Sequence, residues 1–138
     1  MAERSRTRQN RPVFETHPQL VFTHAPEPQD TPALIAFHQP PVALHHPLRD
    51  SGMLEEPGQL AALLAALPRA AAVLTGHAHT ATASTFAGRP LIDGLAITWT
   101  LRMPGEGDRA ADRDQPPGLA FHVMDDERRL TTHYRVVL

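Results

Sequence analysis

Two short apolar runs separated by one helical stripe dominate the first half of the chain. Residues 33–37 and 71–75 are continuous apolar runs, which is typical of strands buried on both faces. Between them the spacing predicts a helix over about 58–67, which begins after Pro57 and carries the apolar face Leu60, Leu63, Leu64 and Leu67. The order strand, helix, strand predicts a parallel pair joined by a right-handed crossover.

The second half of the chain has the sequence pattern of short antiparallel strands. Short alternating or apolar segments predict strands over 82–86, 90–92 and 95–103, with a turn at Ala87-Gly88. A polar stretch over 105–118 predicts a solvated loop, and segments 118–125 and 130–138 predict a closing hairpin. The predicted fold class is therefore α/β, with a short parallel βαβ unit followed by antiparallel strands.

The first 32 residues differ from the rest. They are rich in proline and poor in apolar positions, so residues 1–32 are predicted to be an irregular or disordered lead-in, with one short strand near 20–23. Residues 33–138 then form the predicted domain. The lead-in carries an arginine cluster, which either contacts phosphate or is a solvated tail.

Composition excludes several classes of protein. The chain of 138 residues has 13 basic and 15 acidic residues, and this formal charge of −2 argues against binding nucleic acid through bulk charge. No apolar run has the roughly 18 residues of a membrane helix, and no secretory signal is present, so the sequence predicts a cytoplasmic protein without a membrane partner. The absence of cysteine excludes disulfides and thiolate metal sites.

Three histidines stand where strands of the predicted sheet end. His38 follows the first apolar run, and His77 and His79 follow the second. The carboxyl ends of parallel strands meet at one edge of a sheet, and residues i and i+2 of an extended segment point the same way. Imidazole is a common metal ligand. The spacing leaves two interpretations open, a metal site or ordinary surface histidines.

Other polar residues fit structural roles. His45 and His46 are adjacent, so they point in opposite directions and are predicted to serve the loop. Asp93 is predicted to be a turn residue, with support of the metal ligands as the alternative. His122 and His133 alternate with apolar residues and are predicted to lie on the exposed face of the closing hairpin.

Two of these segments resemble motifs of one family. His38-Gln39-Pro40-Pro41 looks like the His-His-Pro-Pro element of calcineurin-like metallophosphoesterases, and Gly76-His77-Ala78-His79 looks like their Gly-His-x-His element. Residues 84–91 resemble the strand pair that follows, and residues 118–135 resemble the closing hairpin of the cyclic-nucleotide (class III) phosphodiesterase branch. The resemblance covers about residues 32–138 and implies the C-terminal part of an α/β-β/α sandwich.

The resemblance also implies a chemistry. Matched residue by residue, His38, His77 and His79 are metal ligands of a dinuclear centre that holds Fe, Mn or Zn. Such a centre hydrolyses a phosphodiester, such as a cyclic nucleotide, with metal-activated water. The second histidine of the first element is Gln39 here.

The ligand motifs of the family's N-terminal half are missing from the sequence. Asp-x-His, Gly-Asp-x-x-Asp and Gly-Asn-His do not occur, so the carboxylate that would bridge two ions is absent. We therefore expect the chain alone to have little or no activity, as a truncated, mis-started or split phosphoesterase would. The alternatives are a non-catalytic remnant or interaction module, and a small protein with one zinc ion on three histidines.

A partial domain implies an uncovered surface. One predicted helix can cover only part of the two strands, so we expect an open edge or a thinly covered face around Leu34, Ile35, Val73 and Leu74. Such an edge predicts self-association or a partner chain.

Overall fold

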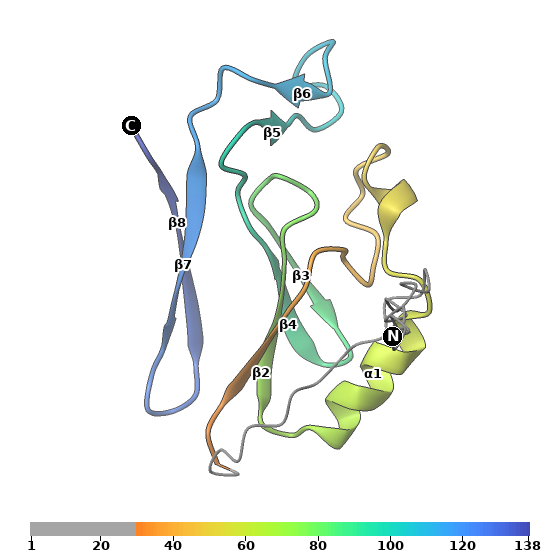
Figure 1. Ribbon diagram of the computed structural model, residues 1–138, viewed down its shortest axis with the longest axis vertical. Coiled ribbons are helices and arrows are strands. Elements are labelled where there is room, and N and C mark those ends of the chain that lie inside the picture. The colour runs from red at the N-terminus through yellow and green to blue at the C-terminus, as the bar shows by residue number, and fades with distance from the viewer. Residues whose placement is uncertain (1–29) are drawn as a thin grey trace, which may run out of the picture.

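A four-stranded mixed sheet forms the centre of the described part of the chain. The computed structural model describes residues 30–138, which have a mixed α/β fold with many strands and one α-helix. The sheet has the strand order β1 (Ala33–Ala36), β2 (Ala70–Thr75), β4 (Arg89–Asp93) and β3 (Thr82–Phe86). The first three strands are parallel, and β3 pairs with β4 antiparallel (Figure 1).

The crossover from β1 to β2 carries the helix. A loop with the short 3-10 helix η1 (Asp50–Gly52) leads into α1 (Pro57–Ala66), which confirms the predicted helix to within one residue. Pro57 occupies the first turn, where its missing N–H costs nothing. Leu60 and Leu64 are fully buried in the main apolar core, where α1 packs against the sheet.

The closing hairpin lies on the side of the sheet opposite α1. It consists of β7 (Gly118–Met124) and β8 (Leu130–Val136), as the sequence predicts. Figure 1 shows the hairpin on one side of the sheet and the helix on the other. The Tyr134 hydroxyl donates a hydrogen bond of 3.0 Å to the carbonyl of Asp93, which ties β8 to the end of β4.

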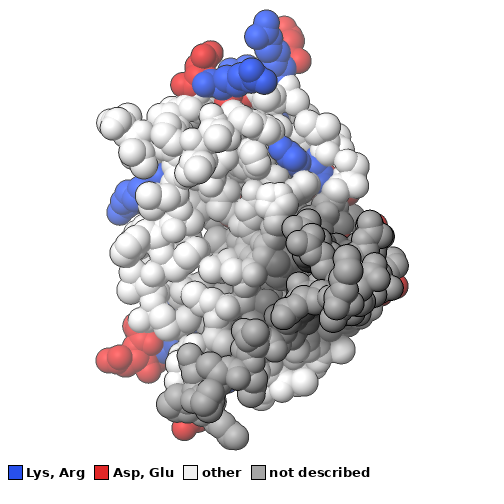
Figure 2. All heavy atoms as spheres, in the orientation of Figure 1, with Lys and Arg blue, Asp and Glu red and all other residues white. Residues whose placement is uncertain are grey.

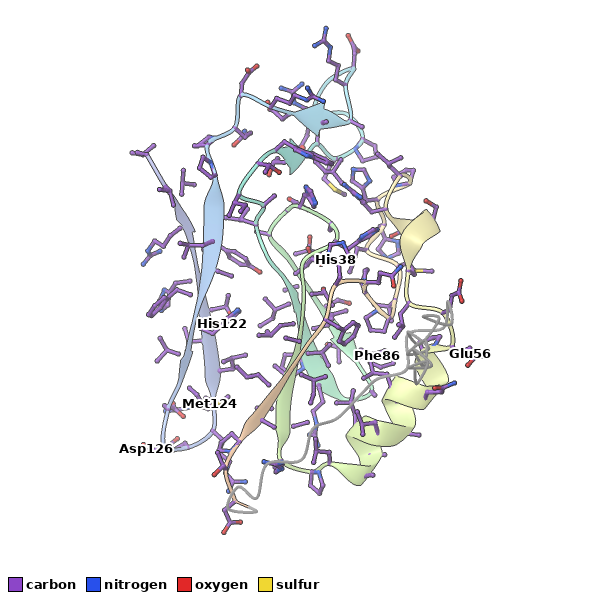
Figure 3. All side chains as sticks on the ribbon, viewed as in Figure 1. His38, Glu56, Phe86, His122, Met124 and Asp126 are labelled. Carbon is purple, nitrogen blue, oxygen red and sulfur yellow. The ribbon has the colours of Figure 1, made fainter. Side chains whose placement is uncertain are left out.

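Strand β7 exposes its larger apolar side chains and turns His122 inward. The register places Phe121 opposite His133, and His122 opposite Thr132. Phe121 and His133 therefore face outward, and Phe121 is 59% exposed. His122 is half-buried and bonds the Thr132 hydroxyl at 2.9 Å, so its predicted exposed position is wrong; Figure 3 labels it on the hairpin.

The segment between β4 and the hairpin contains less strand than the sequence predicts. Of the strand expected over 95–103, only β5 (Thr100–Leu101) forms, and it pairs with β6 (Ala111–Asp112), inside the stretch predicted to be a loop. Backbone carbonyls before β5 bond other partners, since Ala96 accepts from the Gly118 N–H at 2.9 Å. An ion pair between Arg102 and Asp112, with Nη2 and Oδ2 at 2.6 Å, closes β5 against β6.

β1 and β2 are both apolar runs in the sequence, but they differ in burial. Ala72 and Val73 of β2 are fully buried, because β2 lies between two strands and is covered on both faces. β1 lies at the edge of this sheet and alternates between half-buried and exposed residues, with Leu34 40% exposed. Among residues 30–138, the predicted open edge is therefore present at Leu34, whereas Val73 is enclosed.

Charged side chains are unevenly distributed over the visible surface. Figure 2 shows them gathered over the β5–β6 end and around the β7–β8 turn, with a largely uncharged surface between. Among residues 30–138, no helix has the length and apolar character that a bilayer crossing requires. The predicted lead-in, with the strand near 20–23, lies almost wholly outside the described residues.

Candidate functional site

His38 and His77 meet at the carboxyl edge of the parallel strands. The ladder continues past the strand ends, because the Phe37 N–H bonds the Leu74 carbonyl at 3.1 Å and the Gly76 N–H bonds the His38 carbonyl at 3.3 Å. This backbone pairing places the two imidazoles side by side, with His38 Nε2 and His77 Nδ1 3.1 Å apart. The rings are nearly perpendicular, with centroids 5.0 Å apart (Figure 3 labels His38).

His79 turns away from this contact. Its backbone is left-handed, with φ of +56°, so the extended His-x-His geometry that the sequence predicts does not form. Its ring Nδ1 instead donates to the Trp99 carbonyl at 3.2 Å, and the two rings lie 4.2 Å apart between centroids. A Nδ1–H bonded to a carbonyl leaves Nε2 with its lone pair, which is the form that ligates metals.

The buried carboxylate of Asp93 binds the loop that carries His77 and His79. Asp93 is the last residue of β4 and is 1% exposed, so its predicted position in a turn is wrong. Its carboxylate accepts a bond of 2.6 Å from the Thr75 hydroxyl and one of 3.1 Å from the Ala78 N–H. Burial raises the pKa of Asp93, and these hydrogen bonds oppose the rise. Asp93 therefore fixes the backbone between His77 and His79.

Gly52 and Arg49 complete the surroundings of the histidines, and neither is identified by sequence reasoning. A Cβ added to Gly52 would lie 2.8 Å from His77 Nε2, so only glycine leaves room for this ring. Burial lowers the pKa of His77, and the positive charge of Arg49 lowers it further. Burial also lowers the pKa of His79, where Arg49 acts in the same direction. Both shifts favour the neutral imidazole, which is the form that ligates metals.

The histidine pair fits one divalent ion, but the set of ligands around it is small. Two nitrogen ligands about 2.0–2.1 Å from one zinc ion lie roughly 3.3 Å apart at a tetrahedral angle. The 3.1 Å between His38 and His77 is close to that separation. Within residues 30–138, however, no group of three or more histidine and carboxylate side chains is arranged to hold a metal. The described residues thus offer a pair of ligands plus the separate His79.

The remaining described histidines have other positions. His46 is buried and bonds the Arg102 carbonyl through Nε2 at 2.9 Å, which confirms a structural role, while His45 beside it is exposed. His133 is exposed on the hairpin, as predicted.

Comparison with known proteins adds no relative. No protein-family model matches the chain, and none of the curated proteins matches it. We call the end of the sheet that carries His38, His77 and His79 the histidine edge. Its geometry and the motif resemblance are therefore the two observations on which a function can be based.

Proposed function

We propose that the histidine edge is part of a metal-dependent phosphoesterase centre, which hydrolyses a phosphodiester such as a cyclic nucleotide. The observation that carries the proposal is the 3.1 Å approach of His38 Nε2 to His77 Nδ1, at the edge where α/β sheets place their ligand sites. The order of the two histidine motifs along the chain adds support. On this proposal the fold is part of a metallophosphoesterase sandwich.

Each residue of the edge then has a role. In a centre completed by further carboxylate ligands, His38 and His77 would hold one divalent ion (Fe, Mn or Zn), and Nε2 of His79 would hold a second. When bound, the ions supply a Lewis acid for the phosphoryl group and activate water. Asp93 positions the loop that carries the two later histidines, through its bond to the Ala78 N–H.

The set of residues also limits what the chain does alone. Three neutral imidazoles do not balance the charge of two divalent cations, and hard cations prefer oxygen ligands beside nitrogen. The sequence lacks the carboxylate motifs of the resembling family. We therefore expect at most one weakly held ion per chain and very slow hydrolysis.

Metal binding is the first test. Isothermal titration of the purified chain with Zn²⁺ or Mn²⁺ is expected to give one weak site. The variants His38→Ala and His77→Ala are expected to lose about tenfold or more in affinity, since each removes one of two ligands. His133→Ala is the matched control, because this histidine is exposed on the hairpin. Equal affinity in all variants would rule out the histidine edge as the site.

Activity is the second test. With Mn²⁺, the chain is expected to hydrolyse bis(p-nitrophenyl) phosphate slowly, above the rate of the metal alone, and His77→Ala is expected to remove the excess. Efficient turnover would show that the chain supplies its own carboxylate ligands. Absence of both metal binding and hydrolysis would favour a non-catalytic interaction module, whereas one tight zinc ion held by all three histidines would favour the single-zinc alternative.

A further inference from the structure

Arg49 is held beside the histidine edge by its own backbone. Its N–H bonds the His46 carbonyl at 2.9 Å, and its carbonyl accepts from the Gly52 N–H at 2.9 Å. Because Gly52 lies against the ring of His77, this turn fixes the arginine next to the candidate ligands. The position of Arg49 is thus determined by the same short segment that makes room for His77.

The side chain of Arg49 lies over the ring of Trp99. Its guanidinium carbon lies 5.1 Å from the centroid of the Trp99 ring, and Trp99 in turn contacts the ring of His79. A guanidinium stacked on an aromatic face keeps its N–H groups in the plane for hydrogen bonding. Trp99 thus contacts both Arg49 and His79, and we call these three residues the arginine column.

The charge of Arg49 has no counterion among the described residues. None of the ion pairs within residues 30–138 includes Arg49, and its Nε is buried without a hydrogen-bond partner. The adjacent carboxylate, Asp50, accepts a hydrogen bond from the Leu44 N–H at 2.8 Å and forms no ion pair with Arg49. Arg49 as a whole is only half-buried, so a guanidinium without a charge partner in this part of the chain is expected to attract an anion.

The surroundings select an anion as that ligand. Arg49 lies over the Trp99 ring, which contacts His79, and its turn includes Gly52, which lies against His77, so its charge is near both rings. A forked guanidinium binds tetrahedral oxyanions through two parallel hydrogen bonds. We infer that Arg49, on the arginine column, anchors a phosphate or phosphate-ester oxyanion beside the histidine edge. The choice of phosphate rests on the proposed phosphoesterase function.

Trp99 makes this inference directly measurable. It is the only tryptophan in the chain, so tryptophan fluorescence reports on the surroundings of this one ring, which include Arg49. Titration of the metal-free chain with inorganic phosphate, at constant ionic strength kept with chloride, is expected to change the emission saturably. Arg49→Gln is expected to weaken phosphate binding by about tenfold, which corresponds to about 1.4 kcal/mol. Arg135→Gln, on the exposed face of the hairpin, is the control and is expected to bind as the wild type does.

A second variant separates anchoring from folding. Arg49→Lys keeps the charge and most of the stem but loses the fork, so an intermediate phosphate affinity with an unchanged melting temperature is expected. Wild-type phosphate affinity in Arg49→Gln would overturn the inference, and so would equal binding of acetate in place of phosphate. If phosphate binding depends on Arg49 but no metal binds His38 and His77, the anion site stands and the proposed function fails. If metal binds His38 and His77 but phosphate binding does not depend on Arg49, the proposed function stands and the anion site is ruled out.

Discussion

At two positions beside the histidine edge the residue type is restricted, at one by the space available and at the other by the hydrogen bonds it makes. Gly52 is an example, because its conformation is open to other residues and only the ring of His77 excludes a Cβ. Asp93 is another, because its two bonds join Thr75 and Ala78 across the sheet. Both residues act on the candidate ligands without being candidate ligands themselves.

Gly52→Ala is expected to displace the imidazole of His77 and to weaken metal binding, because the new Cβ would lie 2.8 Å from Nε2. The melting temperature should change little, since the ring lies at the surface edge of the sheet. Titration with Zn²⁺ and thermal melting check the two parts. Gly58→Ala is the control, because nothing lies within 4 Å of its added Cβ. Unchanged metal affinity in Gly52→Ala would contradict the assigned role of His77.

Asp93→Ala is expected to destabilise the fold by about 1–3 kcal/mol for each donor left unpaired. Thr75→Val removes one of the same bonds of the Asp93 carboxylate, so the double variant should lose less than the sum of the two single changes. Chemical denaturation of the three variants measures this coupling. Simple additivity would show that the two side chains act independently.

Helices and strands form as the sequence predicts where the local pattern and the tertiary neighbours favour the same structure. The helix over 57–66 and the hairpin strands form as predicted because leucine spacing, proline and turn residues all indicate the same structure. β1 and β2 read alike as apolar runs, and only their place in the sheet separates an edge strand from a central one. That place depends on β4 pairing with β2, a long-range contact that local pattern does not contain.

Part of the candidate site could likewise be predicted from the sequence, and part could not. The rule that ligands gather at the carboxyl ends of parallel strands predicts the contact between His38 and His77. The same rule would have selected Asp93, had β4 been recognised as parallel to β2. The left-handed backbone of His79 and the approach of Arg49 to Trp99 depend on tertiary packing, so no sequence pattern indicates them.

The turn of the closing hairpin is held by Asp125. Its carboxylate accepts from the N–H groups of Glu127 at 3.0 Å and Arg129 at 2.8 Å, and from Arg129 Nε at 2.7 Å. The backbone bond from Arg129, followed by its side-chain bond, lowers the pKa of Asp125. A carboxyl whose folded pKa is lowered contributes stability above its unfolded pKa, and this contribution is lost as the pH falls through the folded value.

Asp125→Asn is therefore expected to lower the melting temperature at pH 7. The difference from the wild type should shrink as the pH falls below about 4, where the wild-type carboxyl also takes up its proton. Thermal melting across this pH range checks the expectation, with Asp126→Asn at the exposed neighbouring position as the control. A difference that does not vary with pH would show that the charge of Asp125 is not involved.

The whole molecule presents an apolar surface on the hairpin. Leu119, Phe121 and Val123 are 43%, 59% and 44% exposed on the face turned away from the sheet. Contiguous apolar residues of this kind favour association. We therefore expect the wild-type chain to self-associate as its concentration rises.

Phe121→Ser is expected to reduce this association with little effect on the free energy of unfolding, because the ring is mostly exposed. Leu91→Ala, in the core, is expected to cost about 2–5 kcal/mol instead. Light scattering over a concentration series and chemical denaturation measure the two effects. A monomeric wild type at high concentration would contradict the expectation.

The insertion of β4 between β2 and β3 has a consequence for the order in which the chain folds. The turn at Ala87-Gly88, with both φ angles positive, is the type that closes a hairpin locally and quickly. The contact between His38 and His77 instead closes 39 residues, so the histidine edge is expected to assemble after the rate-limiting step. Gly88→Ala should then slow refolding, while His38→Ala should leave the refolding rate unchanged, as stopped-flow Trp99 fluorescence would record. A slower refolding of His38→Ala would instead place the histidine edge in the folding nucleus, and the chemistry of the site would then form together with the sheet that carries it.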